Sequence, residues 1–304
     1  MRTDLANSII NLKEDYLNMI FLTGDLGYMA LEEVRVAFGS QFINAGIAEQ
    51  NMITVAAGMA YEGFIPWVYS IAPFTVLRPY EQIRNDVCLH NLPVKIVGNG
   101  GGYGYGIMGC THHVLEDIAV MRVLPNMRVY VPLIASDVED VVRMMMNDPA
   151  PNYLRLNNSR KLSFPIDRFK QWRKIKEGKS IVIIGTGPTL LNLFDLQEKN
   201  LLDEIELWSV GLFPIHEIPE ALLSSLENKK KLITIEEHEG QCGLNETIAQ
   251  LLLGKISYPI KYHNLHANGY PSGRVGSQKW HQEENNLAGN GLIKAIKGMI
   301  NENI

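Results

Sequence analysis

The chain has 304 residues, of which 46% are hydrophobic, and a formal net charge of −5. This length suffices for two domains with separate cores, and the acidic balance argues against a nucleic-acid-binding protein. No apolar run approaches the roughly 18 residues that a membrane-spanning helix needs. The three cysteines, Cys88, Cys110 and Cys242, are far apart in the sequence. This spacing favours a reduced, cytoplasmic protein without structural zinc.

Apolar strands alternate with helical patterns along the first half of the chain. Residues 1–20 predict an acidic amphipathic helix rather than a signal or transit peptide. Strands are predicted in the ranges 19–27, 65–73, 92–101, 127–132 and 152–156, and helices in the ranges 48–63, 78–91, 112–125 and 135–148. Because parallel strands are joined by helical crossovers, this alternation predicts a parallel sheet covered on both faces.

The pattern changes after residue 157. Residues 158–179 are basic, contain Pro165 and show no clear period, so they predict a linker across the surface. A second unit follows, with strands predicted at 180–188, 205–213 and 231–237 and helices at 189–200, 217–230 and 243–254. We therefore predict two α/β domains, residues 1–157 and 180–304, each with a mainly parallel sheet flanked by helices.

Glu49 is an isolated acidic residue among small and apolar neighbours. Met52, Val55, Ala56 and Met59 recur at helical spacing and predict a buried face, from which Glu49 also projects. One interpretation is a glutamate that the positive end of the helix dipole favours and that faces water. The other is a carboxyl held against apolar surface, which stays protonated and donates a hydrogen bond.

The segment 98–113, GNGGGYGYGIMGCTHH, is the other unusual stretch. Gly104, Gly106 and Gly109 form a G-x-G-x-x-G motif, but it does not follow a strand directly, as the dinucleotide fingerprint requires. A glycine-rich loop after a strand still lets the backbone approach a ligand closely. His112 and His113 end this loop, and contact with a substrate or cofactor is favoured over a metal site because no third ligand stands nearby.

Several other motifs carry less information. His263 and His266 form H-x-x-H without the glutamate of a zinc protease motif, so we interpret them as surface or structural residues. The stretch 236–240, EEHEG, predicts a solvated turn. The sequence contains neither a G-x-x-x-x-G-K-[ST] loop nor the G-D-G followed by Asn that holds a magnesium diphosphate in thiamine enzymes.

The segment from Phe42 to Phe74, with its G-I-A-E-Q block, resembles the pyrimidine-binding domain of transketolases and deoxyxylulose-phosphate synthases. The motifs RPYEQIRNDV, NLPVKIVG, GCTHH, LPNMRVYVP and YLRL follow in the order of that family, and the second unit resembles the transketolase C-terminal domain. The resemblance implies a thiamine-diphosphate-binding fold followed by that domain. Since the diphosphate motif is missing, it also implies the C-terminal subunit of a split transketolase of carbohydrate metabolism.

The resemblance implies a role for Glu49. In the family, the matching glutamate hydrogen-bonds N1′ of the aminopyrimidine of thiamine diphosphate and thereby promotes loss of the cofactor's C2 proton. The cofactor then transfers a two-carbon ketol unit from a ketose to an aldose, sugars that we expect to be phosphorylated. A carboxyl can donate to N1′ only when it is protonated, which agrees with the dry environment inferred above.

Four further site residues follow from the resemblance. Phe74 falls where the family places an aromatic ring against the pyrimidine, and Tyr69 is a second candidate for cofactor contact. His112 matches a histidine that contacts substrate hydroxyls, and Arg155 matches an arginine that binds the sugar phosphate. The magnesium ligands are expected on the partner chain, and none on this one. The family architecture implies a dimer of heterodimers with an N-terminal, diphosphate-binding subunit, without nucleic-acid or membrane partners.

The sequence departs from the family pattern at three positions. Met108 and Cys110 replace the Asp and Pro of the common D-G-P-T-H motif, and Gly100 replaces a phosphate-binding histidine. These differences suggest an acceptor other than the usual pentose phosphates. Two alternatives stay open at this stage: the β subunit of a 2-oxo-acid dehydrogenase, which has a related fold, and a non-catalytic subunit that retains the fold.

Overall fold

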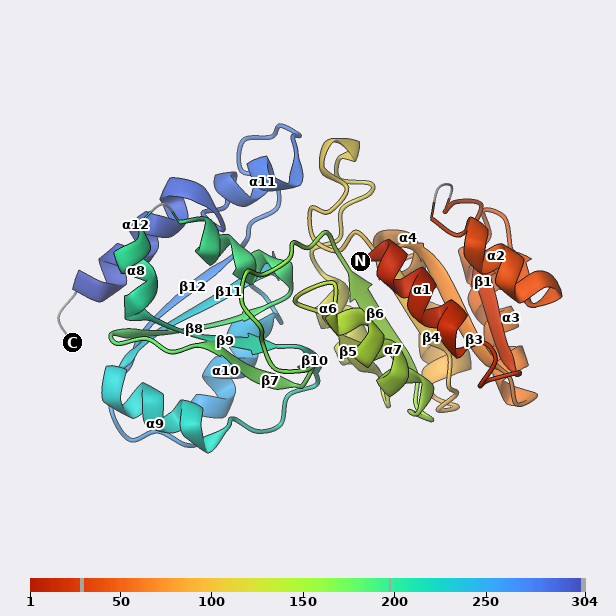
Figure 1. Cartoon of the computed structure of the whole chain (residues 1–304), viewed down its shortest axis with the longest axis horizontal. Helices are drawn as coiled ribbons and strands as arrows, with labels where there is room; N and C mark the ends of the chain where they lie inside the picture. Colours follow the sequence, from red (N-terminus) through yellow and green to blue (C-terminus); the bar gives the residue numbers. More distant parts are fainter. Residues whose placement is uncertain (28–29, 197, 302–304) are drawn as a thin grey trace.

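Two mainly parallel β-sheets, one in each half of the chain, form the framework of the molecule (Figure 1). The computed structural model describes residues 1–27, 30–196 and 198–301. Figure 1 shows the two halves side by side along the long axis, with α12 at the end far from β1 and α2. Within the described ranges, no helix is both long enough and apolar enough to cross a membrane.

The first sheet has seven strands in the order β10-β5-β6-β4-β3-β1-β2. Its strands are β1 (Met19–Thr23), β2 (Phe42–Asn44), β3 (Ile65–Ile71), β4 (Lys95–Asn99), β5 (Arg128–Tyr130), β6 (Asn152–Leu156) and β10 (Leu212–Phe213). All neighbours are parallel except β10, which pairs antiparallel with β5. The edge strand β10 comes from the second half of the sequence and therefore joins the two halves.

The second sheet has five strands in the order β12-β11-β8-β9-β7. Its strands are β7 (Trp172–Lys176), β8 (Ile181–Thr186), β9 (Ile205–Val210), β11 (Lys231–Glu239) and β12 (Lys261–Ala267). Only β7 runs antiparallel to its neighbour, β9. Both sheets are therefore mainly parallel, as the sequence predicted.

Helices cover both faces of each sheet. In the first half they are α1 (Arg2–Leu12), α2 (Glu32–Phe38), η1 (Gly39–Gln41), α3 (Glu49–Tyr61), α4 (Ala72–Val76), α5 (Tyr80–Gln82), η2 (Ile83–Cys88), η3 (Gly106–Met108), α6 (Asp117–Arg122) and α7 (Asp137–Met146). In the second half they are η4 (Pro188–Asp195), α8 (Lys199–Glu204), α9 (Glu220–Lys229), α10 (Leu244–Leu253), α11 (Gln278–Glu284) and α12 (Gly289–Asn301).

Alternate residues of the first sheet serve two different cores. Phe21 and Trp67 pack with α1, α2 and α7 on the face seen in front in Figure 1. Leu22 and Val68 point the other way, into a core with α3, and this core continues into the second half of the chain. Because successive side chains of a strand alternate between faces, one strand supplies both cores.

The structure changes three details of the sequence prediction. The range 158–179 is not all linker, because its residues Trp172–Lys176 form β7 of the second sheet. Residues 236–240 are not a solvated turn, since Glu236, Glu237 and His238 are at most 2% exposed within β11. In α3, Val55 is 37% exposed, and Ile53 and Ala57 are buried beside Met52 and Ala56.

Candidate active site

Glu49 is the first residue of α3, which follows β2 at the carboxyl edge of the first sheet. The residue is 6% exposed. No side chain caps the N-terminus of α3 with a hydrogen bond. Its carboxylate oxygen Oε1 accepts a hydrogen bond of 3.1 Å from Nη1 of Arg78. The described structure therefore gives this buried carboxyl a specific cationic partner rather than open water.

Arg78 also lies against Phe74, four residues earlier and in α4. The guanidinium carbon is 3.9 Å from the centroid of the Phe74 ring, a distance typical of a cation–π contact. Arg78 itself remains 48% exposed, while Phe74 is half-buried. One guanidinium thus connects the predicted catalytic carboxyl with the predicted aromatic ring.

His112 also contacts Phe74. The two rings meet edge to face, with their centroids 5.4 Å apart. Nδ1 of His112 lies 2.9 Å from the hydroxyl oxygen of Thr111, which constrains the ring orientation. The structure therefore brings Glu49, Phe74 and His112 into one row: Arg78 links Glu49 to Phe74, and Phe74 contacts His112.

Tyr105 extends this row beyond His112. Its ring centroid is 6.0 Å from that of His112, and its hydroxyl accepts a 2.8 Å hydrogen bond from the side-chain amide of Asn99, the last residue of β4. The ring lies over Gly100, where an added Cβ would come within 2.2 Å of Cε2 of Tyr105. The absence of a side chain at Gly100 therefore provides the space that the Tyr105 ring occupies.

Glu237 of the second sheet holds the glycine-rich loop in place. Its Oε1 accepts a 2.6 Å hydrogen bond from the backbone N–H of Tyr103, and its Oε2 accepts a 2.6 Å bond from the hydroxyl of Thr189. A Cβ at Gly102, whose φ is +64°, would lie 2.4 Å from Oε1 of Glu237. The loop that carries His112 is thus anchored by a buried carboxylate from the other half of the chain.

Two predicted site residues lie outside the row. Tyr69 is 2% exposed in β3 and packs near Phe21, in the core beneath α1 and α2, where burial raises its pKa. The side chain of Arg155 is 2% exposed; its Nε donates to Asp117 at 2.8 Å and its Nη2 to the backbone oxygen of Glu237 at 2.9 Å. This placement favours a structural role for Arg155 between the two sheets over contact with a substrate phosphate.

The sequence reasoning did not name Arg78, Tyr105 or Glu237. A signal for Arg78 was present, because it follows Phe74 by four residues and could reach the same ring on a helical turn. No local pattern pointed to Glu237, whose partners come from residues far away in the sequence. Within the described ranges, no three His, Cys, Asp or Glu side chains come together as a group that could hold a metal ion.

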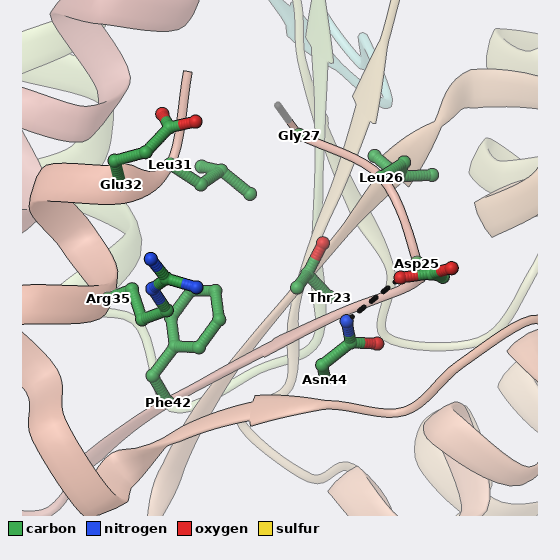
Figure 2. A pocket seen from close by; sticks show the side chains of 9 residues that line it. All are labelled: Thr23, Asp25, Leu26, Gly27, Leu31, Glu32, Arg35, Phe42 and Asn44. Carbon is green, nitrogen blue, oxygen red and sulfur yellow. Dashed lines mark hydrogen bonds between the residues drawn. The ribbon is translucent and has the colours of Figure 1, made fainter. Parts of the chain in front are cut away.

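A separate pocket opens at the ends of β1 and β2 (Figure 2). Its volume is about 330 Å³, and its lining residues are Thr23, Asp25, Leu26, Gly27, Leu31, Glu32, Arg35, Phe42 and Asn44. Figure 2 shows Glu32 and Arg35 of α2 on one side and the hydrogen bond between Asn44 and Asp25, 3.1 Å long, on the other. Asn44 lies five residues before Glu49, so this pocket borders the segment that leads into α3.

Known proteins resemble the chain over most of its length. Residues 1–161 match the family described as transketolase, pyrimidine binding domain. The chain is 30% identical to a subunit of the apulose-4-phosphate transketolase of Actinobacillus succinogenes over 71% of each chain. It is 32% identical to a putative transketolase C-terminal section of Methanocaldococcus jannaschii, over 83% of this chain and 81% of that one.

Solved structures agree with these sequence matches. A split-gene transketolase, described as an inactive beta4 tetramer, superposes with a TM-score of 0.82 at 28% identity, over 98% of this chain and 97% of that one. A transketolase from Campylobacter jejuni superposes with a TM-score of 0.72 at 18% identity, over 97% of this chain but 46% of that one. The second likeness shows a shared fold in about half of a longer protein.

Proposed function

The chain belongs to the transketolase family, and from this membership and the row of Glu49, Phe74 and His112 we propose that it is the C-terminal subunit of a split transketolase. In this role it supplies the pyrimidine side of a thiamine diphosphate site and takes part in transfer of a two-carbon ketol unit from a ketose to an aldose. The single observation that carries the proposal is the buried carboxyl of Glu49 beside the Phe74 ring and its stacked guanidinium.

The residues of this row fit an aminopyrimidine. The planar guanidinium of Arg78 already stacks on Phe74 and donates to Glu49, so a flat, nitrogen-bearing ring meets a matching surface here. Thiamine diphosphate, when bound, supplies the carbon nucleophile that cleaves the bond next to the ketose carbonyl. Glu49 would hold a carboxyl proton at N1′ of the pyrimidine, and Phe74 would fix the tilt of that ring.

His112 and Tyr105 would act on the substrate side. His112 is half-buried, and its ring is fixed between Phe74 and Tyr105, so a ring nitrogen can hydrogen-bond a sugar hydroxyl. Tyr105 accepts a hydrogen bond from Asn99, which leaves its own hydroxyl proton free to be donated. We assign Tyr69 and Arg155 to the support of this site, since both side chains are buried away from solvent.

The proposal includes a partner subunit that holds the diphosphate and its magnesium. It is supported by relatives that are named as a transketolase subunit and as a C-terminal section, and by the likeness to a split-gene transketolase over nearly the whole length of the chain. A dimer of heterodimers in the cytoplasm would pair two copies of this chain with two diphosphate-binding subunits. The substrates would be sugar phosphates, as the name of the apulose-4-phosphate relatives suggests.

Reconstitution tests this function. The purified chain alone should bind thiamine diphosphate weakly and show no ketol transfer, whereas the chain combined with a diphosphate-binding subunit should show both binding and turnover. Titration calorimetry with thiamine diphosphate and Mg²⁺ and an assay of ketose cleavage measure the two properties. Full turnover by the chain alone, or none in the assembled complex with any phosphorylated ketose, would refute the proposal.

A further inference from the structure

The guanidinium of Arg78 makes two contacts at once. Nη1 donates to Oε1 of Glu49 at 3.1 Å, and the guanidinium carbon lies 3.9 Å from the centroid of the Phe74 ring. The first is a hydrogen bond to a buried carboxyl, and the second is a stack of a flat cation on an aromatic face. Both Glu49 and Phe74 are thus engaged by one side chain of the same subunit.

These are also the two contacts that the proposed aminopyrimidine needs. An aminopyrimidine ring would stack on Phe74 and hydrogen-bond Glu49, and two flat groups cannot share one face of one ring. A guanidinium resembles the ring in being planar, delocalised and rich in nitrogen. In the described structure, Arg78 thus makes the two contacts, with Glu49 and with the face of Phe74, that such a ring would make.

The side chain of Arg78 can move away from Glu49 and Phe74. Its side chain is 48% exposed, and it stands on the turn between α4 and α5, with the exposed Leu77 on one side. Glu49, by contrast, is 6% exposed at the start of a 13-residue helix. When a ring enters, Arg78 is the member of the pair that moves, since rotation about its side-chain bonds takes it into water without disturbing a helix.

We propose that Arg78 is an internal occupant of the pyrimidine site, which covers Phe74 and pairs with Glu49 in the free subunit and swings out when the cofactor ring binds. The inference rests on the proposed function, because it takes the incoming ring to be the aminopyrimidine. The consequence for regulation is that the side chain of Glu49 stays paired with Arg78 until the cofactor arrives, so in the free subunit it is not available to another ring.

Competition for the ring face is the measurable consequence. The variant Arg78→Met keeps a long side chain but removes the charge and the planar group. The probe is 4-amino-5-hydroxymethyl-2-methylpyrimidine, titrated into the full-length chain, followed by thiamine diphosphate with Mg²⁺ in the assembled complex. Loss of one cation–π contact and one half-exposed ion pair should tighten probe binding by about tenfold. Methylguanidinium should weaken probe binding in Arg78→Met and have little effect in the wild type.

Controls separate the occupant role from a general effect of charge. Arg84 is exposed in η2 and bonds only to its neighbour Asn85 among the hydrogen bonds described, so Arg84→Met should leave probe affinity unchanged. Arg78→Lys should bind the probe with intermediate affinity, since an ammonium pairs with Glu49 but does not stack as a flat group. The Nε–H signal of Arg78 in a ¹⁵N NMR spectrum, identified by its loss in Arg78→Met, should shift when the wild type is saturated with the probe.

The outcomes distinguish the two proposals. Weaker or unchanged binding in Arg78→Met, together with an Arg78 signal that does not move, would overturn the occupant role while leaving the function intact. Binding that Glu49→Ala leaves unaffected, or no binding of probe and cofactor to any variant or to the assembled complex, would overturn the proposed function and the inference with it.

Discussion

Arg155 and Asp117 form an ion pair, with Nε and Oδ2 2.8 Å apart, and both side chains are at most 2% exposed. The hydroxyl of Tyr153 donates to the same carboxylate oxygen at 2.7 Å. The second contact of Arg155, with the backbone oxygen of Glu237 in β11, reaches the other sheet. The pair therefore fastens the two halves of the chain near the site.

Replacing Arg155 by Met should destabilise the protein. Removing one partner leaves a buried charge without compensation, which typically lowers the free energy of unfolding by about 3–5 kcal/mol. Chemical denaturation measures this quantity. The matched control is Arg168→Met, because Arg168 pairs with Asp140 but is 82% exposed, and solvent screens such a pair, so its loss should leave the free energy of unfolding nearly unchanged.

Kinetics of the same Arg155 variant test the predicted phosphate contact. If Arg155 is structural, the KM values for phosphorylated and unphosphorylated ketoses should change by the same factor in the assembled complex. A selective rise in the KM of the phosphorylated ketose would show that the guanidinium does reach substrate phosphate in the complex.

The variant Glu49→Gln should lose most of its activity while keeping its fold and its subunit assembly. An amide can donate to N1′ but cannot exchange a proton with the ring, and general acid–base steps of this kind are worth about 10²–10⁴-fold. Exchange of the cofactor's C2 proton, followed by NMR in the assembled complex, measures the effect. Glu33 is exposed in α2, so Glu33→Gln is the control. If Glu49→Gln exchanged the C2 proton at the wild-type rate, Glu49 would have no catalytic role and would serve only at the start of its helix.

The variant Gly100→Ala should displace Tyr105 from its place beside His112. The new Cβ would lie 2.2 Å from Cε2 of Tyr105, and Gly100 has a φ of +79°, which disfavours alanine. We expect Gly100→Ala to raise the KM of the ketose. If the Tyr105 hydroxyl contacts substrate, Tyr105→Phe should raise the same KM. As a control, Gly298→Ala fills open space in α12 and should stabilise the protein by roughly 0.5–1 kcal/mol without changing KM. Unaltered KM in both site variants would exclude Tyr105 from substrate contact.

Acid should destabilise the protein through His238. Burial lowers the pKa of this histidine to about 4, while Asp117 and Arg155 act on it in opposite directions. Its Nε2 accepts from the backbone N–H of Ala119 at 3.2 Å, and its Nδ1 lies 2.8 Å from the backbone oxygen of Glu239, an arrangement that suits the neutral ring. An unfolded chain binds this proton below about pH 6.5, so the contribution of His238 to stability falls as the pH drops from 6.5 toward 4.

The size of this effect can be measured by difference. Between pH 7 and pH 5, the titration of His238 should lower the free energy of unfolding by about 2 kcal/mol. The variant His238→Gln should therefore show a shallower pH dependence than the wild type, whereas His216→Gln, at an exposed position, should not. Parallel curves for the wild type and His238→Gln would show that other groups account for the acid sensitivity.

The elements with strong local signals were predictable from the sequence. The strand predicted at 65–73 and the helix predicted at 48–63 followed from an apolar run and helical spacing, and they are confirmed as β3 (Ile65–Ile71) and α3 (Glu49–Tyr61). The parallel pairing of β3 with β1 and β4 follows from the alternation of strands and helices. These features depend on residues close together in the chain, so a linear reading captures them.

The failures share a different cause. Glu236, Glu237 and His238 look like a solvated turn because charged residues are usually exposed, yet the partners of Glu237 come from distant segments, at Tyr103 and Thr189. The ion pair of Arg155 could not be predicted for the same reason, since its partner Asp117 lies 38 residues away in the sequence. The strand β7 was missed within the predicted linker. Its backbone pairs with the free edge of β9, so it can form without a strong hydrophobic pattern in its own sequence.

The short strand β10 makes the two halves of the chain poor candidates for separate expression. Leu212 and Phe213 pair with Tyr130 and Val129, so a fragment that ends at residue 157 would present the open edge of β5 to solvent. Unpaired strand edges recruit other strands, and such a fragment should self-associate through β5. Gene fusions, affinity tags or split reporters should therefore be placed at the chain ends rather than between residues 157 and 214.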